Sequence, residues 1–468
     1  MDFSPAALAM GKLALIFAVL ILLLRRHVPL WLTIFAGCLV AALISGISPA
    51  VWPSLLLGVP RQQGFLILCL MIFLILVLSG VQEATGQNHR LVEGLERYIH
   101  SPRIRLVLFP ALIGLLPMPG GALFSCPMIR DAARKMNLSA KKKTLINYWF
   151  RHIWELAWPL YPGYALVCSL LSIPISTLWK YSFPLVFLSF AAGWFFFLRD
   201  LDRSLEAPNS KGAEETGQTP DTGACACSGA DASAPDSRTP SGAGPEAVQR
   251  DESLFMVLAH ALPLIVTLGG AALFGLIFDR FLPEAPGQLV FSLSLALAIA
   301  TALYQGRGHR TKSLRSIAFG RNTGRIMLLL FAIYTFKDTI AEGGIVAALS
   351  GLGDSTPMVL LTFLIVPFIS GLLTGILVGL VGLAFPILLG VLAHSHLQEY
   401  TTPLVVLGLI AGNCGQLLSP LHVCLVVTCE FFTTALPGIM RSLFAPTVCY
   451  CVCGILWVCV LAAMGASF

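Results

Sequence analysis

The segment LLPMPGGALFSCPM, residues 115–128, decides how the rest of this chain is interpreted. It lies in the middle of an apolar run, residues 106–129, but it contains three prolines and two adjacent glycines. Arg105 precedes the run and Arg130 follows it. A straight membrane-spanning helix would place one of these basic flanks on the wrong side of the membrane, because Lys and Arg collect in cytoplasmic loops. The run therefore favours a segment that enters the membrane and returns.

The composition is that of a polytopic membrane protein. The chain has 468 residues, of which 56% are hydrophobic and only 12% are charged. Several apolar runs have about 18 residues or more, which is the length needed to cross a bilayer. No small-residue cleavage site follows the first run, residues 8–24, so we expect an uncleaved span. Basic cytoplasmic loops explain the net charge of +6, and no nucleic-acid partner is implied.

Lys and Arg are concentrated in alternate loops, which predicts the orientation of the chain. The basic residues gather at residues 25–26, 90–105, 130–143, 199–250, 307–325 and 441, and the other loops contain few. The rich loops face the cytoplasm under the positive-inside rule. We therefore predict a multi-pass protein of the inner (cytoplasmic) membrane, with its N-terminus outside and its central linker in the cytoplasm.

Residues 106–129 are long enough for two helical arms of about 12 residues, each reaching past the middle of the membrane. Pro117 and Pro119 cannot continue a helical hydrogen-bond ladder, and Gly120 and Gly121 permit a turn. Irregular backbone at membrane depth is tolerated only where protein or a water-filled cavity satisfies its polar groups. The run thus predicts a re-entrant hairpin whose tip lines a site. The alternative is an ordinary span kinked by proline.

The second half of the chain repeats this pattern. In IVPFISGLLTGILVGLVGLAFPIL, residues 365–388, the GLL of residues 371–373 aligns with that of residues 114–116. No Lys or Arg flanks this second run, so we expect the second hairpin to open to the outside. In the next segments, WELAWPLYPGYALV aligns with GQLLSPLHVCLVV, which places Glu155 over Gln416, and the offset grows from 255 to 261 along the chain. Related halves with opposite loop charge form an inverted repeat, the plan of many secondary transporters.

We predict an all-α polytopic membrane protein in which each half has about five spans, one re-entrant hairpin and one broken helix. The linker is rich in Ala, Gly, Ser, Pro and acidic residues, so we expect it to be disordered and cytoplasmic. The predicted divisions are a first repeat, residues 1–200, with hairpin 104–130 and broken helix 145–171; the linker, residues 201–252; and a second repeat, residues 253–468, with hairpin 358–394 and broken helix 403–435.

PALIGLLPMPGGALFSCPM, PFISGLLTGILVGLVGLAFPIL and GQLLSPLHVCLVVT resemble an uncharacterised family of integral membrane proteins, the domain of unknown function 401. This family is grouped with the ion transporter superfamily, which includes gluconate permeases, dicarboxylate and citrate carriers and arsenite exporters. The resemblance implies hairpins that enter from opposite sides and meet broken helices at the substrate, often in a homodimer. The Ser-Asn-Thr tripeptide of the sodium-coupled dicarboxylate branch is absent from both tips, so sodium coupling and carboxylate substrates stay open.

Broken half-helices expose backbone N–H groups with partial positive charge, so tips and breaks that converge near mid-membrane predict an anion site. The glycines spaced four apart at Gly371, Gly375 and Gly379 have an alternative interpretation as a surface for close helix packing. The candidate substrate-binding residues are Pro117, Pro119, Gly120, Gly121, Ser125, Ser370, Gly371, Thr374, Gly375, Asn413, Gln416 and Ser419.

Arg151, His152 and Glu155 lie just before the break that we expect at residues 158–162. Ionisable groups at membrane depth cost at least a few kcal/mol, so they face the protein interior or a cavity. In the functional interpretation Arg151 attracts the anion, and Glu155 or His152 carries a coupling proton. The alternative is that Arg151 and Glu155 pair on one helix face. His422 is a further candidate for charge relay, and its alternative is a satisfied core histidine.

Enzyme motifs are absent from the sequence. It contains no G-x-S-x-G, no H-E-x-x-H, no Walker loop and no dinucleotide-binding motif at a strand-to-helix junction. We expect no enzyme, no metal site and no cofactor other than a coupling H⁺ or Na⁺. We predict a secondary active transporter, or permease, that moves a small anionic solute across the bilayer by alternating access. The alternatives are a membrane-embedded enzyme or lipid-handling protein, and a passive channel.

Overall fold

The computed structural model describes residues 5–115, 121–134, 136, 138–199, 254–281, 286–307, 314–348 and 355–466. Throughout these residues the regular structure is helical, and strands do not occur among them. The all-α fold predicted from the sequence is therefore confirmed. The linker predicted at residues 201–252 lies outside the described residues.

The helices of the first half follow one another with short connections. They are α1 (Pro5–Arg25), α2 (Leu30–Ser45), α3 (Trp52–Gly58), η1 (Val59–Arg61), α4 (Gln63–Ala84), α5 (Gln87–Tyr98), α6 (Pro102–Leu115), α7 (Gly121–Ala132), α8 (Ala140–Arg151), α9 (Pro162–Leu171), α10 (Ile175–Ser182), α11 (Pro184–Gly193) and η2 (Trp194–Leu198).

The second half has a similar order of elements. They are α13 (Leu254–Ala259), α14 (Leu262–Phe281), α15 (Gly287–Gln305), α16 (Leu314–Ala318), α17 (Arg321–Glu342), α18 (Ile345–Ala348), α20 (Thr356–Thr374), α21 (Leu377–Ala393), η3 (Gln398–Tyr400), α22 (Thr401–Leu417), α23 (Val423–Phe431) and α24 (Leu436–Ala463).

Length and apolar composition make this a multi-pass membrane protein. Six helical segments among the described residues are long and apolar enough to cross a membrane. They are Leu8–Arg25, Gln63–Ala84, Ile175–Leu198, Gly287–Gln305, Thr356–Thr374 and Leu436–Ala463.

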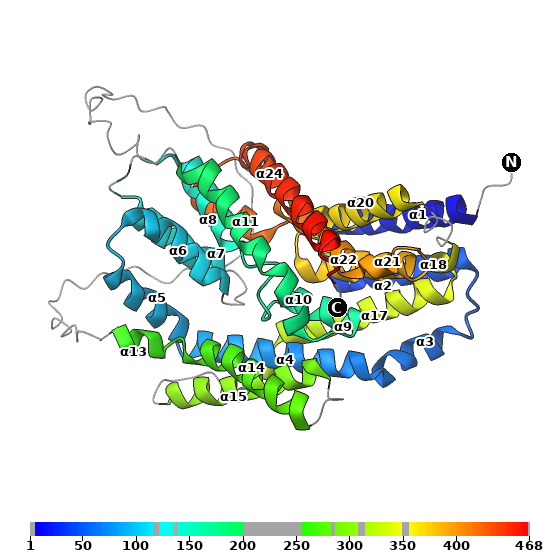
Figure 1. Ribbon diagram of the computed structural model, residues 1–468, viewed down its shortest axis with the longest axis horizontal. Coiled ribbons are helices and arrows are strands. Elements are labelled where there is room, and N and C mark those ends of the chain that lie inside the picture. Colours follow the sequence, from blue (N-terminus) through cyan, green and yellow to red (C-terminus); the bar gives the residue numbers. More distant parts are fainter. Residues whose placement is uncertain are drawn as a thin grey trace, which may run out of the picture.

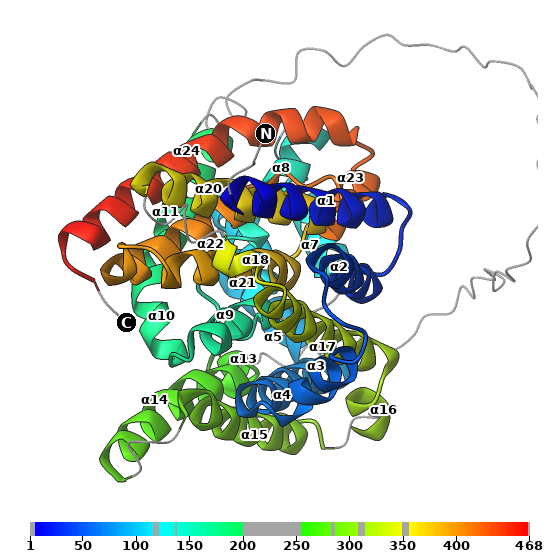
Figure 2. The ribbon, with the colours of Figure 1, turned by 90° about the vertical axis from the view of Figure 1, so that its right-hand side faces the viewer.

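Contacts between the two halves come in matched pairs. Helix α2 of the first half packs against α17 of the second, and α15 of the second packs against α4 of the first. In the same way α9 packs against α21, and α7 against α23. Figures 1 and 2 show α4, α14 and α15 together at one edge of the molecule and α1, α20 and α24 at the opposite edge. The halves are therefore interleaved, whereas their opposed orientation in the membrane stays a prediction.

Two helical hairpins lie towards opposite ends of the long axis, α6–α7 at one end and α20–α21 at the other (Figure 1). The arms of the first have 14 and 12 residues, and those of the second 19 and 17. The second hairpin turns at Gly375, whose φ of 63° lies in the left-handed region that favours glycine. Residues 116–120, with the predicted tip residues Pro117, Pro119 and Gly120, lie outside the described residues.

Each half also contains a helix that is interrupted inside the protein, α8–α9 in the first half and α22–α23 in the second. In the first, the helix ends at Arg151, earlier than the break expected at residues 158–162. The unwound residues are held against α6, because Trp154 Nε1 donates to the Ala111 carbonyl at 3.0 Å and the Tyr161 hydroxyl donates to the Gly114 carbonyl at 2.5 Å. Arg151 therefore lies at a helix end and not within a continuous helix.

Candidate functional site

The first hairpin rests directly on the first broken helix. A Cβ atom at Gly114 in α6 would overlap the carbonyl oxygen of Arg151, so only glycine permits this approach. Gly121 begins α7 and lies against the Arg151 side chain, where an added Cβ would be 2.7 Å from Nη2. Hairpin and break thus meet around Arg151.

The second hairpin makes the corresponding contacts with the second broken helix. A Cβ at Gly371 would overlap the carbonyl oxygen of Gly412, and one at Gly375 would lie 2.9 Å from the backbone nitrogen of His422. The Ser419 hydroxyl donates to the Leu372 carbonyl at 2.7 Å and fastens the break to the hairpin. Gly114 and Gly371 are aligned in the sequence, and so are the carbonyl groups that they touch.

Three hydrogen bonds join the two breaks to each other. Gln416 Nε2 donates to Glu155 Oε1 at 2.9 Å. The Tyr148 hydroxyl donates to the Leu417 carbonyl at 3.1 Å, which satisfies one of the free carbonyl groups at the end of α22. The Nε2 atoms of His152 and His422 lie 2.9 Å apart. The aligned pair Glu155 and Gln416 is therefore a contact pair in the structure.

Arg151 is the least compensated group of this centre. Its side chain is 7% exposed, and neither Nε nor Nη1 has a hydrogen-bond partner within the described part of the chain. Glu155 Oε1 accepts from Gln416, and the ion pairs found among the described residues do not include the helix pairing of Arg151 with Glu155 considered from the sequence. The first turn of α7 adds the partial positive charge of a helix N-terminus. The Arg151 guanidinium and the start of α7 thus place positive charge on the hairpin side of the centre, and the Glu155 carboxylate lies beside Gln416.

The other candidate donors have varied surroundings. The Ser125 hydroxyl donates within its own helix to the carbonyls of Gly121 and Ala122, and Thr374 donates to the Ser370 carbonyl at 2.8 Å. Ser370 Oγ and Asn413 Nδ2 are buried, and neither has a hydrogen-bond partner among the residues that the structure describes. Ser370 and Asn413 thus keep free polar atoms, whereas Ser125 and Thr374 are engaged locally.

Three residues of the centre were not found from the sequence. Tyr148 crosses to the second half, Tyr161 binds the first hairpin, and Cys424 lies beside the two histidines. His422 is buried, precedes α23 as its N-cap and faces His152, so both its interpretations, a charge relay and a core histidine, stay open. The available signal for Cys424 was its position two residues after His422.

The fold and this centre define a class of protein: a multi-pass helical membrane protein in which two hairpins meet two interrupted helices around buried charged groups. The chain belongs to the family described as "Protein of unknown function (DUF401)", whose model matches residues 9–212 and 247–461. No curated protein matches it. A solved structure with a similar fold is that of the Alcanivorax borkumensis YdaH transporter, described as having an unusual topology. The TM-score is 0.60 at 13% identity over 90% of each chain.

Proposed function

We propose that this protein is a secondary active transporter, a permease, that carries a small anionic solute across the inner membrane by alternating access. The observation that carries the proposal is the buried Arg151 guanidinium, which has unpartnered nitrogens at the meeting point of a hairpin and a helix break. The fold shared with a transporter supports it. Membership of the ion transporter superfamily and a homodimeric assembly are parts of the same proposal.

An anion is the ligand that this electrostatic environment favours. Burying a charged group without a partner costs several kcal/mol, so Arg151 is stabilised by any anion that reaches it. Glu155 is the nearest carboxylate in the sequence, but its Oε1 is bound to Gln416. The start of α7 at Gly121 adds the partial positive charge of a helix N-terminus without any further charged side chain. A carboxylate or an oxyanion of similar size satisfies both sources.

The burial of this centre fits an occluded state of an alternating-access cycle. Arg151, His152 and Glu155 are each 7% exposed or less, so a solute bound beside them is shielded from solvent. The hydrogen bonds between the two broken helices join residues of different halves of the chain, Glu155 with Gln416 and His152 with His422. Motion of one half relative to the other therefore changes these bonds. Binding that alters these bonds shifts the balance between inward-open and outward-open states.

Glu155 is the group that we assign to coupling, with H⁺ as the ion. The Glu155 carboxylate accepts a hydrogen bond from the Gln416 amide. When the carboxylate takes up a proton, that hydrogen bond can be lost while the Glu155 side chain stays in place. His152 suits this role less well, because its Nδ1 bonds the Tyr148 carbonyl at 2.6 Å and its Nε2 faces His422. Coupling to Na⁺ is the competing outcome of the test below.

The test begins with thermal stability of the purified protein against gluconate, dicarboxylates, tricarboxylates and other small anions, with and without sodium, at acid and neutral pH. A ligand at 100 times its dissociation constant adds about 2.7 kcal/mol to the folded state. We expect one anion class to raise the melting temperature of the wild type and of the control Arg441→Gln, which changes an exposed arginine, and to leave Arg151→Gln unchanged. An equal shift in Arg151→Gln would contradict the anion site, and a shift with lipids alone would favour a lipid-handling protein.

Transport is then measured in proteoliposomes with the identified anion. Saturable counterflow is expected of a carrier and distinguishes it from a channel. Glu155→Gln is expected to retain counterflow and to lose uptake driven by a pH gradient. Unchanged pH-driven uptake in this variant would remove Glu155 from the coupling mechanism, and a sodium requirement in the wild type would replace H⁺ by Na⁺.

A further inference from the structure

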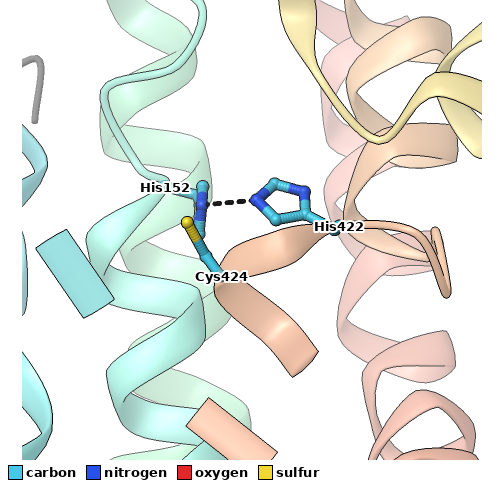
Figure 3. A group of neighbouring side chains, drawn as sticks. All are labelled: His152, His422 and Cys424. Atoms are coloured by element: carbon cyan, nitrogen blue, oxygen red, sulfur yellow. Dashed lines mark hydrogen bonds between the residues drawn. The ribbon is translucent and has the colours of Figure 1, made fainter. Parts of the chain in front are cut away.

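Two imidazoles and a thiol converge where the two broken helices meet. His152 comes from the end of α8, and His422 and Cys424 come from the start of α23. One potential ligand atom from each residue lies within 4.8 Å of the others. His152 and His422 are 7% and 3% exposed. Figure 3 shows the Cys424 sulfur beside the His152 ring and a dashed line that joins the His152 and His422 rings.

The hydrogen bonds of His152 fix which of its nitrogens is free to bind a ligand. Its Nδ1 lies 2.6 Å from the Tyr148 carbonyl, and a carbonyl oxygen only accepts, so Nδ1 carries the hydrogen. In the neutral ring Nε2 then presents a lone pair towards His422. Metal-binding histidines commonly show this arrangement, in which a backbone carbonyl on one nitrogen orients the other nitrogen towards the ion.

His422 is less restrained than His152. Its Nδ1 is buried and meets no partner at hydrogen-bonding geometry in the described part of the chain, and its Nε2 faces His152. Two nitrogens bound to one tetrahedral Zn²⁺ at 2.0–2.1 Å are about 3.3 Å apart. The present separation of 2.9 Å requires an opening of only a few tenths of an ångström. A small rotation of His422 supplies it.

We propose that His152, His422 and Cys424 form a binding site for a zinc-class divalent ion, with His152 and His422 binding through Nε2 and Cys424 through its thiolate. Nitrogen and sulfur donors of this kind select Zn²⁺ over Mg²⁺ or Ca²⁺, which require oxygen ligands. Three protein ligands leave a fourth position for water or an anion. The ion replaces the single contact between the two rings with bonds to both halves of the chain.

The charges of the site agree with those of its surroundings. A divalent ion bound by one thiolate and two neutral imidazoles leaves a net single positive charge. Arg151 at the end of α8 and Glu155 in the unwound residues that follow contribute one charge of each sign. The balance stays positive, so the ion reinforces the attraction of an anion. Metal binding itself is measured without transport and does not depend on the proposed function.

The test uses the full-length protein, purified with its affinity tag removed and stripped of metal by a chelator. Co²⁺ is added as a spectroscopic probe, followed by displacement with Zn²⁺. We expect one Co²⁺ per chain and a thiolate-to-cobalt charge-transfer absorption that Zn²⁺ abolishes. Cys424→Ser should lose the absorption, whereas Cys429→Ser, a buried thiol on the same helix, should keep it. His422→Gln should weaken binding at least tenfold, whereas His394→Gln, an exposed histidine after α21, should not.

The proposal is overturned if folded wild-type protein binds no Co²⁺ or Zn²⁺, or if Cys424→Ser retains the charge-transfer absorption. Folding is checked separately by monodisperse elution and by a cooperative thermal transition. Should Cys424→Ser fail to fold, X-ray absorption of the zinc-loaded wild type decides the matter. One sulfur and two imidazoles among the ligands would support the site, and a spectrum without sulfur would overturn it.

Discussion

The two broken helices have the same backbone contacts and different side-chain chemistry. In each, a glycine of a hairpin touches a backbone carbonyl, Gly114 on Arg151 and Gly371 on Gly412. At the offset of 261 that aligns Glu155 with Gln416, Arg151 aligns with Gly412. The first half therefore carries an arginine and a carboxylate where the second carries a glycine and an amide.

This difference distinguishes the residues that the interrupted helix requires for folding from those that it requires for function. The second half forms an interrupted helix against its hairpin with no charged side chain at the aligned positions, so neither Arg151 nor Glu155 is required for the break itself. Charged groups at membrane depth carry a free-energy cost that packing alone does not demand. The asymmetry agrees with the anion site proposed beside Arg151 in the first half.

The largest effect expected concerns the direction from which each hairpin is reached. In a background lacking the 13 native cysteines, Pro119→Cys should label from the cytoplasmic side and Leu373→Cys from the outside. Membrane-impermeant maleimide applied to oriented vesicles gives an all-or-none readout. Labelling of both positions from one side would end the comparison of the halves as inverted repeats.

The next effect concerns the two glycine contacts, which should be equally intolerant of a side chain. Gly114→Ala and Gly371→Ala each place a Cβ against a backbone carbonyl, and we expect a loss of about 3 kcal/mol or more in stability. Gly275→Ala in α14 is the control, because its Cβ meets open space, and alanine there should raise helix stability by up to about 1 kcal/mol. Thermal unfolding in detergent measures all three. A tolerated change at only one hairpin would show that the two contacts are not equivalent.

The exchange of Glu155 and Gln416 tests which half must carry the charge. Gln416→Glu alone removes the amide donor and places a second carboxylate against that of Glu155. We expect a loss of about 2 kcal/mol in stability at neutral pH. The double variant Glu155→Gln/Gln416→Glu restores an amide–carboxylate pair and should recover stability to within about 1 kcal/mol. Its transport should remain impaired, because the charge has moved to the second half. A double variant no more stable than Gln416→Glu would show that a carboxylate is not accommodated at position 416 even when an amide faces it.

The smallest effect expected is that of a single hydroxyl between the halves. Tyr148→Phe removes the bond to the Leu417 carbonyl and should lower stability by about 1 kcal/mol. Tyr148 aligns with Leu409, which has no hydroxyl, so the second half offers no reciprocal bond. Tyr400→Phe, at an exposed tyrosine, serves as the control for loss of a hydroxyl. Equal melting temperatures for the two variants would indicate that the Tyr148 bond adds nothing to the joining of the halves.

Sequence reasoning identified features that depend on local backbone chemistry. Prolines and glycines predicted two helical hairpins and two interrupted helices, although α8 ends at Arg151, before the residues 158–162 where its break was expected. Alignment of the halves pairs Glu155 with Gln416, which share a hydrogen bond. The contact of His152 with His422 spans 270 residues, and no local pattern reports such a meeting. The early end of α8 at Arg151 depends on bonds from Trp154 and Tyr161 to α6, which are tertiary contacts that override local helix preference.

The interleaving of the halves has a consequence for biogenesis. Since α2 packs on α17 and α4 packs on α15, the first half leaves the ribosome without the helices that cover it. Glu155 is synthesised 261 residues before Gln416, the residue that donates a hydrogen bond to it. During that interval the newly inserted first half holds polar groups in the bilayer that its own helices do not satisfy, a state that invites misassembly or degradation. We therefore expect the native structure to form only after the second half is complete, and two separately expressed halves to accumulate only together.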